Sequence, residues 1–544
     1  MHTQSIEENT AYVIGVDVGT GSARAGIFDT RGHLVASDKA PIAMFRQGAE
    51  RVEQSSEDIW QAVVTAIQGA MSNARVTADV ITGLGFDATC SLVVIGPRGQ
   101  PLPVGDEQHP ERNIIVWMDH RANEQATRIN QHRHPVLDYV GGRISPEMET
   151  PKLLWLKENR PTTYQDAWQF LDLTDYLTWR ATGSLARSVC TVTCKWTYLA
   201  HENRWDPDYF RAIGLEDLAD AGFARIGTEM VEPGSALGQG LTKISAEQLG
   251  LLPGTPVAAG LIDAHAGGIG SIGAGPDNPP EDNLAYVFGT SSCTMTSTTE
   301  PVLVPGVWGP YYSAMVPGYW LNEGGQSAAG AAIEQLLRLH PYSAVAQSLA
   351  EQQNQSLPEW LADQAIHNAL SVSEAVHCAK GLHVVPEFLG NRAPFADPHC
   401  RAVIAGLGMV NELDSLIALY VAGLCGIGYG LRQILEAQEA AGAPVKRLVI
   451  SGGAGRHPLI RQLLADTTGY AVVAPTSDEP VLLGSAILAT VASSHHESIQ
   501  VAMAEMTSIN ASYQPCEGEL KRLHHNRFQT FAQLQRTARE STMF

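Results

Sequence analysis

The first thirty residues alternate between short apolar runs and a polar glycine turn, a pattern that predicts a β-hairpin. Two apolar stretches, residues 13–18 and 23–29, flank the turn GTGS at residues 19–22. Strand-forming residues on both sides of a glycine turn are typical of antiparallel pairing. Asp17 is unexpected, because it falls among apolar positions of the first strand, where an unpaired charge is costly. This carboxylate either caps its own turn or serves a binding site at the end of the strand.

The pattern then continues as strands and helices. Residues 34–42 predict a third strand, and residues 80–96 predict a strand, a loop and a strand. Between them, apolar residues recur at helical spacing over residues 59–71, and Ser55, three residues before Asp58, resembles a capping box. A mostly helical region is expected at residues 122–180, with the core candidates Trp155, Leu156, Phe170, Leu171 and Leu173.

The second half of the chain opens like the first. Residues 284–301 again predict a strand, a glycine turn that begins at Gly289, and a strand, and Gly289 lies 270 residues after Gly19 (289 − 19 = 270). A repeat at half the chain length indicates duplicated domains. Residues 273–283, rich in Gly, Pro and Asp, predict the loop between them. We therefore expect an α/β protein with an N-terminal domain at 10–275, a C-terminal domain at 284–500 and a helical extension at 501–544.

Two further glycine clusters differ in what they predict. In residues 447–469 an apolar strand runs into GGAG and then a helix, and a helix with Pro480 near its first position follows a second strand. Glycine amides and helix N-termini bind phosphate or ribose-phosphate groups, so this cluster indicates a nucleotide site. Residues 268–273 match GxGxxG, but DAHA precedes them where a strand should be, and no ribose-binding acid follows. They predict a small-residue helix face.

Composition narrows the classes of function. The 544 residues are 44% hydrophobic and 17% charged, which is typical of a folded enzyme with two large domains. A formal net charge of −21 argues against nucleic acid as the main partner. The eight cysteines include no CxxC pair, and Cys190 and Cys194 lack further zinc ligands close by, so we expect reduced thiols.

We expect a soluble, cytoplasmic protein. The N-terminus has no basic region before its apolar stretch, unlike a secretory signal. The uncharged run from Leu416 to Leu431 is short and glycine-rich for a membrane span, and it predicts a buried helix.

The hydroxyl-bearing glycine hairpins suit phosphoryl transfer. No P-loop motif occurs. Backbone amides and hydroxyls can hold phosphate oxygens while a carboxylate holds Mg²⁺, and positioning with charge stabilisation then carries most of the catalysis. We predict that Asp17 lies near the metal and that Thr20, Gly21 and Ser22 contact the phosphates.

Six motifs occur in the order found in the FGGY carbohydrate kinases, and the chain resembles that family over roughly residues 10 to 500. The motifs are DVGTGS at 17–22, WMDHRA at 117–122, GLIDAHAGGIG at 260–270, FGTSSC at 288–293, GGQSAAG at 324–330 and LVISGGAGR at 448–456. The resemblance implies the two-domain actin-like, ribonuclease-H-like ATPase fold with an interdomain catalytic cleft, and ATP and Mg²⁺ as cofactors.

The resemblance also assigns roles. It implies that Asp263 is the general base that accepts the proton of the sugar hydroxyl. It implies a second phosphate segment and an adenosine segment, formed by Gly289, Thr290 and Ser291, and by Gly452, Gly453 and Ala454. Trp117 matches a tryptophan that lines the sugar pocket. Residues 190–196 and 322–330 look most like ribulokinases, in which a lysine and a glutamate at the places of Lys195 and Glu323 contact the ketopentose.

The loop TCSLV, which begins at Thr89 and Cys90, matches the D-ribulokinase group and should shape the floor of the sugar pocket. It has neither the Gln-Met-His arrangement of xylulokinases nor the Arg-Glu pair of glycerol kinases. We predict ATP-dependent phosphorylation of a ketopentose, D-ribulose first, to the 5-phosphate. The alternatives are L-ribulokinase, a broad pentulose or pentitol kinase, xylulokinase and, in another class, an actin-like ATPase without sugar kinase activity. The expected partners are a sugar and ATP, with no nucleic acid and no membrane, and a homodimer is left open.

Overall fold

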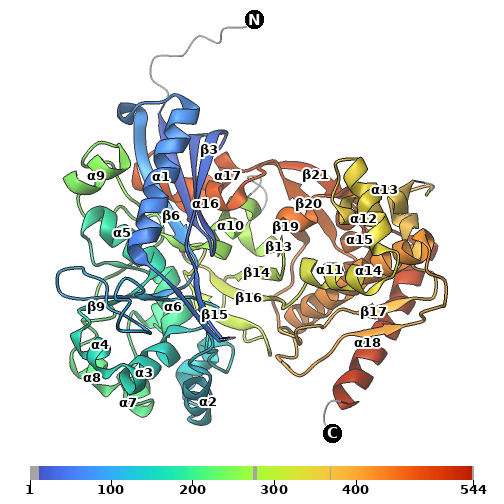
Figure 1. Ribbon diagram of the computed structural model, residues 1–544, viewed down its shortest axis with the longest axis horizontal. Coiled ribbons are helices and arrows are strands. Elements are labelled where there is room, and N and C mark those ends of the chain that lie inside the picture. The colour runs from blue at the N-terminus through green and yellow to red at the C-terminus, as the bar shows by residue number, and fades with distance from the viewer. Residues whose placement is uncertain (1–10, 49, 274–278, 368, 542–544) are drawn as a thin grey trace, which may run out of the picture.

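Two mixed β-sheets of related topology organise the chain (Figure 1). The computed structural model describes residues 11–48, 50–273, 279–367 and 369–541. In the first sheet the strand order is β12-β6-β1-β2-β3, with β1 antiparallel to β2 and parallel to β6. These strands are β1 (Tyr12–Val18), β2 (Ser22–Asp29), β3 (Leu34–Pro41), β6 (Ile81–Ala88) and β12 (Leu261–Ile262).

The second sheet repeats this arrangement with additional edge strands. Its order is β15-β16-β14-β13-β19-β20-β21, with β13 antiparallel to β14 and parallel to β19. These strands are β13 (Asn283–Phe288), β14 (Ser292–Thr298), β15 (Trp308–Tyr312), β16 (Trp320–Gln326), β19 (Arg447–Ser451), β20 (Ala471–Pro475) and β21 (Ile509–Tyr513). The strand–turn–strand unit that recurs 270 residues apart therefore opens both sheets, β1-β2 in one and β13-β14 in the other.

A smaller third sheet of order β4-β5-β8-β7-β9 lies beside the first. Its strands are β4 (Phe45–Gln47), β5 (Arg51–Gln54), β7 (Leu92–Ile95), β8 (Ile114–Ile115) and β9 (Gln169–Asp172). The prediction of a mostly helical region at residues 122–180 is confirmed, with β9 as a short strand within it, and the core candidates Phe170 and Leu171 of this strand are buried. Two-stranded ladders pair β10 (Arg187–Ser188) with β11 (Met230–Val231), and β17 (His383–Val385) with β18 (Val403–Ala405).

Helices cover these sheets. Those of the first half are α1 (Ser56–Ala74), α2 (Asn123–Gln131), α3 (Glu149–Asn159), α4 (Pro161–Asp166), α5 (Leu173–Thr182), α6 (Val189–Trp196), α7 (Pro207–Ala212), α8 (Glu216–Asp220), α9 (Lys243–Leu249) and α10 (Asp263–Ile272). Those of the second half are α11 (Gly330–Leu339), α12 (Ser343–Gln352), α13 (Leu357–Ile366), α14 (Leu413–Ala440), α15 (Pro458–Thr468), α16 (Pro480–Ala492), α17 (Ile499–Met506) and α18 (Gly518–Ser541).

Helix α1 begins where the sequence predicts. The Ser55 hydroxyl accepts a hydrogen bond from the backbone N–H of Asp58 at 3.3 Å. The Asp58 carboxylate does not complete a capping box, because its Oδ2 instead accepts from the backbone N–H of Ala43 at 2.8 Å. The predicted apolar stripe faces the first sheet and is buried, apart from the partly exposed Val64.

Helix α14 shows how the longest apolar run is used. It is the one helix of the described residues with the length and composition to cross a membrane, and 72% of its most apolar window is buried inside the protein. Helices α11 and α15 pack along it. The prediction of a buried helix at Leu416–Leu431 is confirmed.

The end of the chain differs from the expected helical extension. Helix α18 is present, but β21 precedes it and pairs antiparallel with β20. The segment therefore completes the edge of the second sheet and contributes more than helices.

Helix α16 joins the two halves. It belongs to the second half by sequence, yet it packs on β1 and β6 and crosses α10 (Figure 1). The crossing requires glycine: a Cβ atom at Gly270 would lie 1.9 Å from the carbonyl oxygen of Pro480, and one at Gly484 would lie 2.0 Å from that of Ala266. The GxGxxG match is thus a small-residue helix face, as predicted.

We expect Gly270→Ala to destabilise the protein. Alanine gains about 1 kcal/mol of helix propensity over glycine, but its methyl group would overlap the backbone of α16, and such overpacking costs about 1–3 kcal/mol. Urea unfolding should show a net loss of stability. The matched control is Gly408→Ala, where a Cβ meets nothing within 4 Å. Equal stability of the two variants would mean that the helix crossing adjusts freely.

Candidate active site

Three carboxylates meet where the strands of the first sheet end. Asp17 of β1 lies opposite Asp87 of β6 in the parallel register, and Asp263 begins α10 directly after β12. Asp87 is fully buried, and its burial together with the neighbouring Asp17 raises its pKa well above the usual range. Burial and Asp17 likewise raise the pKa of Asp263 to about 6. Bringing a cation to this cluster would relieve the repulsion, and carboxylate oxygens are the ligands that Mg²⁺ prefers.

Asp87 is the member of this cluster that the sequence prediction missed. Its Oδ2 accepts a hydrogen bond from Ser485 Oγ of α16 at 2.5 Å, and Oδ1 has no hydrogen-bond partner within the described part of the chain. An unpartnered buried carboxylate oxygen fits a site for a divalent cation. The sequence could have indicated Asp87 by the same pattern that indicated Asp17, because each is an acid at the end of an apolar strand.

Arg24 of β2 balances the cluster and was also not predicted. Its Nε and Nη2 donate to Asp17 Oδ2 at 2.8 and 2.5 Å, and its Nη1 donates to Glu479 Oε2 at 2.6 Å. Because Glu479 caps α16, this one guanidinium links the first hairpin to the second half of the chain.

The first glycine hairpin lies beside the predicted sugar tryptophan. The Thr20 hydroxyl accepts a hydrogen bond from Trp117 Nε1 at 3.1 Å. The backbone N–H of Trp117 donates to Ser91 Oγ at 3.1 Å, and that hydroxyl is also 3.1 Å from Thr89 Oγ1. The structure thus brings the predicted phosphate residue Thr20 together with Trp117 and Thr89. Of the rest of this turn, Gly21 is exposed and Ser22 is partly exposed.

The second glycine hairpin and the third glycine cluster meet at another place. The carbonyl oxygen of Thr290 accepts from the backbone N–H groups of Ala329 and Ala331 at 2.9 and 3.1 Å, which anchors the turn that contains Gly289 and Ser291 to the start of α11. Gly452 has φ = +93°, and a Cβ there would lie 2.4 Å from the carbonyl oxygen of Phe288. Only glycine fits this approach of the loop to the end of β13.

A cavity of about 690 Å³ opens beside this loop. Gly453 and Ala454 line it together with apolar residues of the helices α11 to α15, among them Ile333, Leu424 and Ile460. A mostly apolar cavity of this size fits the base and ribose of a nucleotide.

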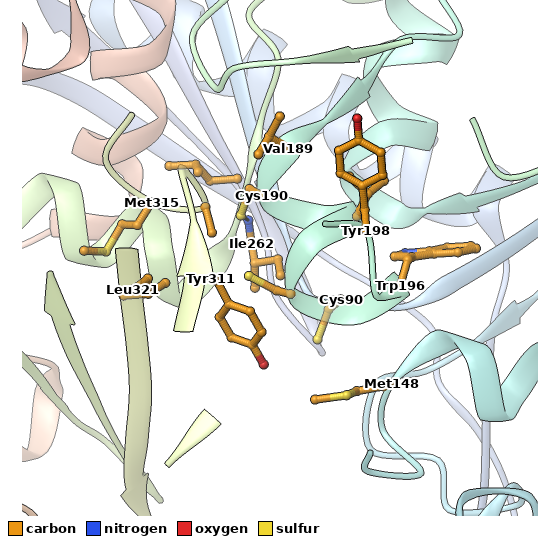
Figure 2. Packing of buried hydrophobic residues seen from close by; sticks show 14 of the residues in the cluster. Cys90, Met148, Val189, Cys190, Trp196, Tyr198, Ile262, Tyr311, Met315 and Leu321 are labelled. Atoms are coloured by element: carbon orange, nitrogen blue, oxygen red, sulfur yellow. Dashed lines mark hydrogen bonds between the residues drawn. The ribbon is translucent and has the colours of Figure 1, made fainter. Parts of the chain in front are cut away.

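The predicted sugar residues Lys195 and Glu323 are buried side chains whose opposite charges act on one another. Both are less than a tenth exposed. Burial alone would raise the pKa of Glu323, but Lys195 and a hydrogen bond from His265 hold it at about 2. The Lys195 ammonium also lies 4.6 Å from the ring centre of Trp308. Figure 2 shows that Cys90 belongs to the same cluster of buried side chains, with Tyr311 and with Ile262, which precedes Asp263.

A buried chain of hydrogen bonds runs behind this pair and was not predicted from the sequence. His265 Nδ1 lies 3.1 Å from Cys190 Sγ, and its Nε2 lies 3.3 Å from Glu323 Oε2. Burial would lower the pKa of His265, but Cys190 and Glu323 raise it to about 10, so the ring is an imidazolium that donates to both neighbours. Although Cys190, Cys194 and His265 lie close enough to hold a metal ion, the imidazole nitrogens are already engaged in this chain. The expectation of unpaired thiols holds, because none of the eight cysteines, all of them described, forms a disulfide.

Asp263 is linked to both groups of residues. The charge of Asp17 raises its pKa, whereas the charges of His265 and Lys195 lower it, and His265, two residues further along α10, contacts Glu323. A carboxylate so placed can take a proton from a hydroxyl held by the charged pair and is close to the carboxylates at the strand ends.

Comparison with known proteins agrees with this geometry. The models of the FGGY family of carbohydrate kinases match the chain in both halves, the N-terminal domain over residues 12–270 and the C-terminal domain over residues 284–493. The chain belongs to the FGGY family of carbohydrate kinases. It is therefore a sugar kinase whose small-molecule partners are a sugar and ATP, and it has the actin-like, ribonuclease-H-like ATPase fold of the family.

Three relatives illustrate how far the similarity extends. An FGGY carbohydrate kinase domain-containing protein of Homo sapiens is 44% identical over 532 residues, covering 96% of both chains. A D-ribulokinase of Saccharomyces cerevisiae is 36% identical over 514 residues, covering 89% of this chain and 72% of the yeast protein. The structure of a ligand-bound xylulose kinase from Lactobacillus acidophilus has a TM-score of 0.79 at 18% identity, covering 97% and 98% of the two chains.

We expect Arg24→Gln to lower the stability of the ligand-free protein. The variant loses charge-assisted hydrogen bonds to a buried carboxylate, each worth about 1.5–3 kcal/mol. Glu479→Gln is the matched control. It removes only the partly exposed ion pair between Arg24 and Glu479, so the loss of stability should be about 0–1 kcal/mol. Urea unfolding of the two variants checks this order, and a larger loss for Glu479→Gln would show that the contact between halves matters more than the charge of Asp17.

Proposed function

We propose that the protein transfers the γ-phosphoryl group of ATP to D-ribulose and forms D-ribulose 5-phosphate, with Asp263 as the general base. The observation that carries this proposal is the place of Asp263 at the start of α10, directly after the strand that ends beside Asp87, on the helix whose His265 contacts Glu323. Residues 10–275 would supply the sugar site and the first phosphate hairpin. Residues 284–500 would supply the second hairpin and the adenosine site.

The sugar would bind by its hydroxyl groups to Lys195 and Glu323, with Trp117 and the loop of Thr89 and Cys90 completing the pocket. Asp263 accepts the proton of the primary hydroxyl as that oxygen attacks the γ-phosphorus, and ADP leaves with the bridging oxygen. The raised pKa of about 6 makes Asp263 a stronger base than an ordinary aspartate while it stays ionised at neutral pH.

The nucleotide would lie between the halves. The adenosine occupies the 690 Å³ cavity beside Gly453 and Ala454, with Gly452 allowing close approach of the loop. The phosphates reach toward the two hairpins, where the residues that would contact them are Thr20, Gly21, Ser22, Gly289, Thr290 and Ser291. Arg24 adds a guanidinium at the first hairpin, suited to phosphate oxygens.

Asp17 and Asp87 would hold Mg²⁺. When bound, the cation neutralises charge on the phosphates. The unpartnered Asp87 Oδ1 and the raised pKa of that carboxyl are the features that fit a cation here. The eight free thiols suit a reducing compartment, and we place the reaction in the cytoplasm.

D-ribulose is the proposed sugar for two reasons. The TCSLV loop matches the D-ribulokinase group, and the yeast relative at 36% identity is a D-ribulokinase. Buried charged residues can also distinguish epimers, since the wrong hydroxyl leaves a polar group unpaired, whereas an apolar pocket could not.

Asp263→Asn should lower kcat by about 10²–10⁴, the usual contribution of general base catalysis, while sugar binding survives. In the wild-type protein kcat/KM should fall as the pH drops below about 6, because protonated Asp263 cannot accept a proton. A bound cation would move this midpoint lower. Steady-state kinetics against pH checks both, with the exposed Asp79→Asn as control. A folded Asp263→Asn protein with near-normal kcat would rule out the base.

D-ribulose should show a kcat/KM at least about tenfold above D-xylulose, which corresponds to about 1.4 kcal/mol. Glu323→Ala should narrow this gap, because its carboxylate no longer senses the C3 hydroxyl, and Glu323→Gln tests whether charge or shape is responsible. The measurement is a kinetic panel of ketopentoses and pentitols. If D-xylulose is the equal or better substrate, the named sugar is wrong and a pentulose kinase of other specificity remains.

A further inference from the structure

A second cluster of metal-binding side chains lies far from the reacting groups. Asp466 of α15, Cys516 and His524 of α18 place a carboxylate oxygen, a thiol sulfur and an imidazole nitrogen within 4.8 Å of one another. Asp466 is 5% exposed and His524 is 1% exposed, whereas Cys516 is partly exposed. Figure 1 shows α18 running along the outer side of the second half, beyond α14.

Two of the donor atoms have no protein partner. Asp466 Oδ2 and His524 Nε2 are buried, and neither takes part in a hydrogen bond among the residues that the structure describes. The Ser373 hydroxyl and the Cys516 thiol approach this carboxylate as hydrogen-bond donors, and together with Gln462 and the backbone N–H of Cys516 they partly offset the rise in its pKa that burial causes. A buried polar atom without a partner costs about 1–3 kcal/mol. Two such atoms beside one thiol indicate that something binds there.

The other atoms of the same groups are held in place. Asp466 Oδ1 accepts from Gln462 Nε2 at 2.8 Å and from the backbone N–H of Cys516 at 2.7 Å. His524 Nδ1 lies 2.9 Å from the hydroxyl of Tyr429 on α14. Each group thus uses one atom for orientation and leaves the other free, as the ligands of metal sites do.

We propose that Asp466, Cys516 and His524 bind a structural Zn²⁺ ion that ties α18 to α15. Thiolate, imidazole and carboxylate are the ligands that zinc prefers, with water from the exposed side of Cys516 as the fourth. His524 binds through Nε2 while Nδ1–H donates to the Tyr429 oxygen. The Cys516 thiol gives its proton to solvent as the sulfur–zinc bond forms, and the two anionic ligands balance the charge of the ion.

The donor atoms lie within 4.8 Å of one another and would move closer together around a bound ion. Zn–S is about 2.3 Å and Zn–N about 2.0 Å, so donors around one ion lie about 3–4 Å apart. The nearby arginines have other partners: Arg432 donates to Glu436 at 2.8 Å, and Arg527 donates to the carbonyl oxygens of Lys380 and Leu382.

The ion would support the nucleotide cavity without touching it. Helix α15, which carries Asp466, contributes Ile460 to the cavity, and α14, which carries Tyr429, contributes Tyr420 and Leu424. The zinc proposal does not depend on the sugar or on the catalytic base.

The test is metal binding by the full chain after removal of bound metal with a chelator. We expect one equivalent of Zn²⁺ to bind and to raise the melting temperature, and Co²⁺ to give a thiolate-to-cobalt absorption band. Cys516→Ser should remove the band and weaken Zn²⁺ binding at least about a hundredfold, and Tyr429→Phe, which removes the hydroxyl that orients His524 and also contacts Arg527, should weaken it about 10–100-fold. His525→Gln, on the exposed side of α18, should change neither.

The other group of possible metal ligands, Cys190, Cys194 and His265, supplies a second control for where the metal binds. If the cobalt band survives in Cys516→Ser but disappears in Cys194→Ser, the metal binds beside the sugar pocket and the proposal is wrong. It is equally wrong if the chelator-treated wild-type protein is folded and binds no Zn²⁺. Because His524→Gln could fail to fold, the decisive variants are Cys516→Ser and Tyr429→Phe.

Discussion

Three carboxylates repel one another at the ends of adjacent strands, and the surrounding structure has to compensate this repulsion. Asp17, Asp87 and Asp263 converge because β1, β6 and β12 run parallel and end at one edge. Arg24 compensates part of the charge, and the pKa of Asp87 rises well above its usual range. The ligand-free protein therefore holds the site in a state that a cation would stabilise, which is how binding energy can be directed to the reacting groups.

The buried ionisable groups near Asp263 pose the opposite problem, that of keeping such groups out of water. Burial would lower the pKa of Lys195 and raise that of Glu323, and in each case neighbouring charges reverse the shift. His265 and Cys190 are also buried, and their contact raises the pKa of the imidazole and lowers that of the thiol. The groups therefore offset one another, which limits the free-energy cost of burying them.

The sequence predicted what local patterns determine. The hairpins follow from apolar runs around glycine turns, α14 follows from a long uncharged run, and the small-residue face of α10 follows from the spacing of its glycines, although the sequence did not predict that α16 packs against this face. The four-residue strand β9 was missed, because a short apolar run does not distinguish a strand from a turn of buried helix. His265 was missed as well, since its partners Cys190 and Glu323 lie far away in the sequence, whereas Arg24 pairs with Asp17 of the same hairpin and only its contact to Glu479 is distant. Asp87 could have been predicted in the same way as Asp17, because it is also an acid at the end of an apolar strand. It was missed because the segment around it was interpreted only as part of the predicted sugar pocket.

The placement of α16 has a consequence for how the two halves of the chain could have arisen and diverged. The halves repeat one strand order, as a duplicated gene would give, yet a helix encoded in the second covers β1 and β6 of the first. A Cβ at Gly15 of β1 or Gly85 of β6 would lie 2.2 Å or 2.0 Å from the backbone of α16, so the close packing of α16 on this face requires glycine at both positions. The first sheet is therefore covered in part by a helix from the second half of the chain. An insertion or exchange of domains would have to preserve the packing of α16 on β1 and β6. The outer helices and loops can therefore vary in evolution far more freely than this contact.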